Sequence, residues 1–300
     1  MKFSQQITFA LLTCLACSLA PALSAQTEPA PLTGEEAANA KLQADVTELV
    51  KLAREANPDL DLSDPVAVQQ AIEALMAESY LLVPVPTAAE IQIIAETVMM
   101  AFMAEIQADP DIDANAVIAN VSSAILTATV AGLEAAAAAA PEGSSTASVT
   151  AAIKAASTGI VGAAAAASSG SESFAATVAA ASSGATTGAV TATAGSTTSS
   201  TEAIQAASGG AVTGAVAATE GSTTSSTEAI QAASNGAVTG AVEAAATAYD
   251  TSPTDAIQAA SNGAVTGAVE ATEGSTTSST DAIQAAANGA TTGAVEAFAV

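Results

Sequence analysis

Residues 225–244 read SSTEAIQAASNGAVTGAVEA, and nearly the same cassette returns several times in the second half of the chain. Its isoleucine recurs about every 26 residues, a fixed period of the kind that marks repeat architectures, at Ile204, Ile230, Ile257 and Ile283. Weaker copies place Ile118, Ile153 and Val178 in the same column. The sequence therefore predicts a repeat region over residues 113–300, built from about seven copies.

Each late copy begins with residues that favour the start of a helix. In residues 225–228, SSTE, a serine hydroxyl can accept a backbone N–H while Glu228 reaches back, which is a capping box. Residues 252–255, SPTD, add a proline at the first helical position. Gly221 and Gly274 stand where a left-handed residue would end a helix. We expect helices of about 20 residues, roughly 30 Å long, whose short connections favour antiparallel neighbours.

Pairs of glycines four residues apart lie inside these expected helices. Each glycine costs about 1 kcal/mol of helix propensity relative to alanine, so another interaction must offset that cost. A groove of small residues lets two helix backbones approach closely and gain dispersion and weak Cα–H···O contacts. We therefore interpret the following glycines as helix-packing residues of a close-packed stack: Gly184, Gly188, Gly210, Gly214, Gly236, Gly240, Gly263, Gly267, Gly289 and Gly293.

A β structure is the competing interpretation of the repeats. The segment GAVTGAV alternates small residues with valine, and Gly- and Ala-rich repeats can stack as cross-β or as a β-solenoid. The capping residues, the proline at the first helical position and the segment EAIQAA favour a helix instead. The predicted fold class is all-α, with the β-solenoid or cross-β repeat as the alternative.

The region before the repeats, residues 33–112, holds most of the large apolar side chains. A capping box at residues 33–36, the pair Asp64 and Pro65, and a second capping box at residues 87–90 each predict the start of a helix. Three helices with this many large apolar residues can share a core of their own. The sequence thus predicts a small N-terminal helical bundle followed by an array of antiparallel helical repeats.

The N-terminus has the composition of a secretory signal peptide, with one lysine, an apolar run and then small residues. We expect cleavage after residues 1–25, followed by a linker over residues 26–32. Cys14 and Cys17 lie inside the predicted leader, so the mature chain would have no disulfide; lipid attachment to Cys17 is the alternative. No later run of about eighteen uninterrupted apolar residues predicts a transmembrane span. We expect a secreted, cell-surface or periplasmic protein.

The net charge of the chain limits the classes of molecule that it can bind. The formal net charge is −25, from 30 acidic and five basic residues, and no Lys or Arg follows Lys154. Neutralising phosphates needs clustered cations, so we expect no nucleic-acid partner. The chain has no histidine and no phosphate-binding loop motif, and its carboxylates form no recognisable catalytic pair. We therefore expect no enzymatic activity and no cofactor.

Two further groups of residues are candidate sites. Asp109, Asp111 and Asp113 follow the first ligand positions of a calcium loop, but Ala114 stands where the turn glycine belongs, and helix capping explains the aspartates more simply. One column of the repeats carries threonine throughout. Side by side, the helices would turn this column into a ladder on a flat surface; its members are Thr187, Thr213, Thr239, Thr266 and Thr292.

From these observations we expect an exported, non-catalytic structural or surface protein whose helical stack self-associates. The alternative function is a binding module for an extended surface, such as a lipid or other hydrophobic interface, ice or a polysaccharide. Both would make the partner either a second copy of the chain or an extracellular surface.

Overall fold

The computed structural model describes residues 34–58, 60–83, 86–139, 148–194, 198–220, 224–247, 251–273 and 277–298. Within these ranges the chain forms ten helices and no strand, so the all-α prediction is confirmed and the β-solenoid alternative is wrong. The predicted leader, the linker, both cysteines, Gly221 and Gly274 lie outside the described residues. The chain divides into two compact units, Met1–Ala37 and Ala38–Val300, and the helices α3 to α11 belong to the second.

The helices follow one another with short connections. The first three are α2 (Gly34–Ala56), α3 (Pro65–Leu81) and α4 (Ala88–Ala108). The repeats supply α5 (Ala114–Ala139), α6 (Val149–Ser168), α7 (Phe174–Thr193), α8 (Ser200–Ala217), α9 (Ser226–Thr247), α10 (Pro253–Thr272) and α11 (Ser279–Phe298).

The helix starts are where the capping residues predicted them. Ser199 and Glu202 form a complete capping box at α8, as do Thr87 and Glu90 at α4. The hydroxyl of Ser252 accepts the backbone N–H of Asp255, and Pro253 occupies the first turn of α10. Because each cap satisfies backbone N–H groups that no helix can satisfy internally, the boundaries are set locally by the sequence.

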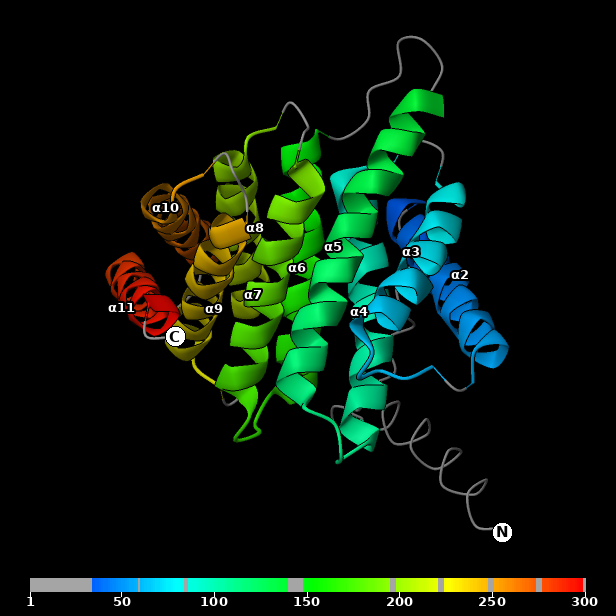
Figure 1. The fold of residues 1–300 in the computed structure, drawn as a ribbon, viewed down its shortest axis with the longest axis horizontal. Helices are drawn as coiled ribbons and strands as arrows, with labels where there is room; N and C mark the ends of the chain where they lie inside the picture. Colours follow the sequence, from blue (N-terminus) through cyan, green and yellow to red (C-terminus); the bar gives the residue numbers. More distant parts are fainter. Residues whose placement is uncertain are drawn as a thin grey trace, which may run out of the picture. The chain divides into compact units, whose positions relative to one another are not determined.

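The helices from α3 to α11 are arranged in two layers, and each of them packs most extensively against a helix two positions away in the chain. One layer contains α4, α6, α8 and α10, and the other contains α3, α5, α7, α9 and α11. Consecutive helices contact each other across the layers less extensively, and they run antiparallel (Figure 1). The structural repeat is therefore a pair of helices, twice the length of the repeat in the sequence.

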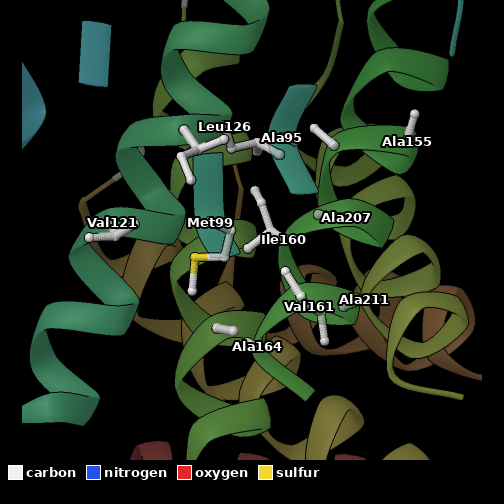
Figure 2. Packing of buried hydrophobic residues seen from close by; sticks show 14 of the residues in the cluster. Ala95, Met99, Val121, Leu126, Ala155, Ile160, Val161, Ala164, Ala207 and Ala211 are labelled. Atoms are coloured by element: carbon white, nitrogen blue, oxygen red, sulfur yellow. The ribbon is translucent and has the colours of Figure 1, made fainter. Parts of the chain in front are cut away.

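The core changes in character along the array. The largest fully buried side chains come mainly from α4 to α6, among them Ile94, Met99 and Leu126. Further along, fully buried alanines such as Ala229 and Ala233 take their place. Figure 2 shows part of this core, where the larger side chains meet the alanines. One cluster of buried apolar residues continues from α2 to α11, so it crosses the boundary predicted at residues 112 and 113.

Two helical segments are long and apolar enough to cross a membrane, judged by length and composition alone. They are Ala114–Ala136 in α5 and Val149–Ser168, which is α6. In each, 61% of the most apolar window is buried inside the fold, and the core helix of a protein without any membrane span passes the same test.

Candidate functional site

The ten glycines predicted to pack helices lie directly against the backbone of a neighbouring helix. A Cβ atom added to Gly236 would lie 2.0 Å from the carbonyl oxygen of Ala179, and one added to Gly240 would lie 2.3 Å from that of Ser183. For all ten glycines this distance to a carbonyl oxygen falls between 2.0 and 2.5 Å. No side chain larger than hydrogen fits there without moving a helix, which accounts for glycine at positions where it weakens the helix itself.

The partners of these glycines define the direction of the helices in each layer. Gly236 faces Ala179 and Gly240 faces Ser183, so one turn forward on α9 corresponds to one turn forward on α7. The two helices are therefore parallel. The antiparallel packing predicted from the short connections holds across the layers, whereas the glycine contacts join parallel helices within a layer.

The contact surface also contains glycines that the sequence analysis missed. A Cβ on Gly159 of α6 would lie 2.5 Å from the carbonyl oxygen of Gln92, which extends the same contact to α4. Aligned copies do place Gly159 in the column of Gly210, six residues after the isoleucine. The spacing of glycine pairs did not predict a contact at Gly159, because its copy has no second glycine four residues later. Gly132 of α5 lies under the ring of Tyr80.

Hydroxyl groups add hydrogen bonds between the helices of a layer. The Ser208 hydroxyl of α8 is buried and donates to the carbonyl oxygen of Ala260 in α10 at 2.7 Å. The Thr187 hydroxyl of α7 donates to the carbonyl oxygen of Gly240 in α9 at 3.3 Å. These bonds use the second lone pair of a carbonyl that already accepts within its own helix. They fix the register of neighbouring helices without requiring a charged group.

The structure divides the predicted threonine column between the two layers. Thr187, Thr239 and Thr292 lie in one layer, and Thr213 and Thr266 lie in the other. The first two and Thr213 are half-buried, while Thr266 and Thr292 are exposed. Four of the five donate to an oxygen of their own helix, for example Thr213 to Gly209 at 2.9 Å. The column is therefore not one continuous ladder.

The acidic candidates for calcium make local hydrogen bonds. Asp109 accepts the backbone N–H of Asp111 at 3.0 Å, and Asp113 accepts that of Ala116 at 3.2 Å at the start of α5. In the part of the chain that the structure describes, no three acidic, cysteine or histidine side chains are grouped so that they could hold a metal ion. Capping accounts for Asp113, and an Asx-type turn accounts for Asp109.

Two glutamates of α4 are held in partly buried positions. Burial raises the pKa of Glu96. Burial also raises the pKa of Glu105, although the Arg54 guanidinium of α2, which forms an ion pair with it, opposes the shift. A carboxyl group with a raised pKa in the folded state stabilises the fold below its unfolded pKa and loses that contribution as the pH rises through the folded pKa.

We expect the variant Glu96→Gln to be more stable than the wild type at pH 7 to 8. The amide keeps the shape of the side chain but avoids a desolvated charge, and the advantage should disappear by about pH 4, where a carboxyl group is largely protonated. Thermal melts of both proteins across this range would measure the difference. The exposed Glu296→Gln variant removes the same formal charge and serves as the control; an equal gain in both would assign the effect to net charge alone.

A groove lies at the outer side of α10 and α11. It has a volume of about 700 Å³, and none of its lining residues is charged. Its walls include Ile257 and Ser261 from α10 and Val295 and Phe298 from α11. Val295 and Phe298 are each 65% exposed. This apolar groove was not identified from the sequence, although Phe298 near the end of the last copy was a visible signal.

No family model, curated protein or solved structure matches the chain.

Proposed function

We propose that the protein is an exported, non-catalytic structural repeat protein that associates with further copies of itself. The observation that carries this proposal is the series of backbone contacts between the helices of each layer, from Gly159 of α6 against α4 to Gly293 of α11 against α9. Contacts between backbones cannot be relieved by a change of rotamer. An array joined in this way is suited to holding a fixed geometry, which is what a structural component requires.

The distribution of polar chemistry supports a non-catalytic role. Asp64 and Asp113 cap the starts of their helices, and hydroxyl groups such as that of Ser208 donate to carbonyl oxygens. Catalysis needs convergent polar groups in a pocket, and the groove at α10 and α11 is lined by apolar and hydroxyl side chains only. Export is inferred from the leader-like sequence of residues 1–25.

The alternative function, a binding module for an extended surface, receives less support where that surface is ice or a polysaccharide. Such a surface needs one regular ladder of side chains, and the threonine column is split between two layers. Three of its five members are also half-buried.

Light scattering coupled to size-exclusion chromatography tests the self-association. We expect the purified protein to show a mass of at least two copies at micromolar concentrations, with the oligomer dissociating on dilution. Adding salt should strengthen the association, because two chains of net charge −25 repel each other and salt screens that repulsion. A monomeric mass at every protein and salt concentration would contradict the proposal.

A further inference from the structure

The outer face of α10 and α11 repeats a face that the fold buries elsewhere. In the isoleucine column of the repeats, Ile153, Ile204 and Ile230 are fully buried. Ile257 on α10 is half-buried and Ile283 on α11 is 42% exposed. The column is covered wherever another described helix follows in the same layer. On α10 and α11 the fold covers this column only in part.

The serine of the same repeats follows this pattern. Four residues after the column residue, Ser157, Ser208 and Ser234 are fully buried inside the array, and Ser208 also donates to the next helix of its layer, at Ala260. Ser261 lies four residues after Ile257 and lines the apolar groove instead. The outer face of α10 thus has the composition of an internal contact surface, with a serine at a position that is fully buried inside the array.

We propose that this face binds the same face of a second copy of the chain, in a twofold-symmetric dimer. The proposal rests on the self-association put forward above and specifies where it occurs. A twofold interface needs a self-complementary surface, with a projection and a recess on the same patch. Phe298 projects from α11 with 65% of its surface exposed, and the groove of about 700 Å³ lies beside it.

Charge favours this face over the rest of the surface. The chain carries 30 acidic residues, yet none lines the groove, so two copies can meet here without desolvating carboxylates. The N-terminal side of the array is less suitable for a head-to-tail contact. There α2 exposes the ion pairs of Lys41 with Asp45 and of Lys51 with Glu48, and burying them would cost free energy.

The size of the face is adequate for a specific, reversible dimer. Each of the two helices has 20 residues. Two helices about 30 Å long and about 10 Å wide present about 600 Å². A standard protein interface buries about 800 Å² on each partner, so this one falls at the weaker end of that class.

Sedimentation equilibrium of the purified protein, alone and as variants, tests the proposal. We expect a dimer for the wild type, and at least a tenfold weaker dimer for Phe298→Asp and for Ile283→Asp, because each places a charge in the apolar interface. Leu81→Asp on α3 is the matched control, since Leu81 is 82% exposed and lies far from this face in the array. The control should dimerise like the wild type. Circular dichroism of each variant confirms that its helices remain folded.

The other outcomes separate this proposal from the proposed function. A wild-type oligomer that Phe298→Asp and Ile283→Asp leave intact would overturn the interface but keep the self-association. A wild type that stays monomeric at all concentrations would overturn both. A monomer that binds phosphatidylcholine vesicles, and loses this binding in Phe298→Asp, would overturn the dimer and assign the face to lipid.

Discussion

The double variant Gly236→Ala, Gly240→Ala is expected to lose about 4 kcal/mol of stability toward unfolding. Each new Cβ would lie 2.0 or 2.3 Å from a carbonyl oxygen of α7, so α9 must move away. Overpacking costs about 1–3 kcal/mol per site, and the upper value applies where the obstacle is backbone. Alanine returns about 1 kcal/mol of helix propensity per site, which leaves a net loss of about 2 kcal/mol for each. Urea unfolding followed by circular dichroism measures it.

A third glycine of the array provides the control for this experiment. Gly162 of α6 is half-buried, and a Cβ added there would lie 3.4 Å from the nearest atom, the carbonyl oxygen of Gly214. We expect Gly162→Ala to be neutral or to stabilise the protein by up to about 1 kcal/mol. The opposite signs are the diagnostic result. If Gly236→Ala, Gly240→Ala were also neutral, the glycines would not be explained by close contact between backbones.

The glycine spacing and the caps were predictable from the sequence because both are local properties. A capping box occupies four residues, and a pair of glycines on one helix face needs only the helical period. Ser199 with Glu202 and Gly236 with Gly240 therefore appear in the structure as the sequence indicated. Close contact at these glycines can therefore be predicted without knowing which helix provides the opposing backbone.

The partner of each helix was not predictable in the same way. A short connection can join two helices of one layer or two helices of different layers. The wide apolar arc of each repeat fits both arrangements. The decision depends on complementary surfaces, such as Gly236 against Ala179, that lie on helices far apart in the sequence. The threonine column illustrates the consequence. Identical positions on consecutive helices were placed in different layers, and the expected single ladder was divided between them.

The N-terminal region shares its core with the repeats, which the sequence did not predict. Its large side chains predicted a bundle with its own core, yet α3 and α4 pack against α5 and α6 in the same pattern as the later helices. Ile94 of α4 lies in the same buried cluster as Ile118 and Ile153 of the repeats. Differences in side-chain size along the array do not interrupt the packing pattern of the backbones.

Replacing Leu126 by alanine is the second change for which we expect a large effect, about 4 kcal/mol of destabilisation. Leu126 of α5 is fully buried, in the same cluster as Ala95 and Met99 (Figure 2). Leucine-to-alanine changes in cores cost about 2–5 kcal/mol, and the cost depends on how far the surroundings can relax into the cavity. Alanine has no side-chain torsion with which to fill a void, so we place this site in the upper half of the range.

Leu81→Ala is the matched control, because Leu81 is 82% exposed and the same atoms are removed from water-accessible surface. Its effect should stay within about 0.5 kcal/mol. A loss for Leu126→Ala of less than about 1 kcal/mol would mean that the layers close around the cavity, which rigid contacts between backbones should prevent. The size of this loss therefore measures the same property as the glycine variants, because the substitution removes three carbon atoms from the core where those variants add a methyl group. Agreement between the two would show that helix positions in the array are fixed by backbone contact.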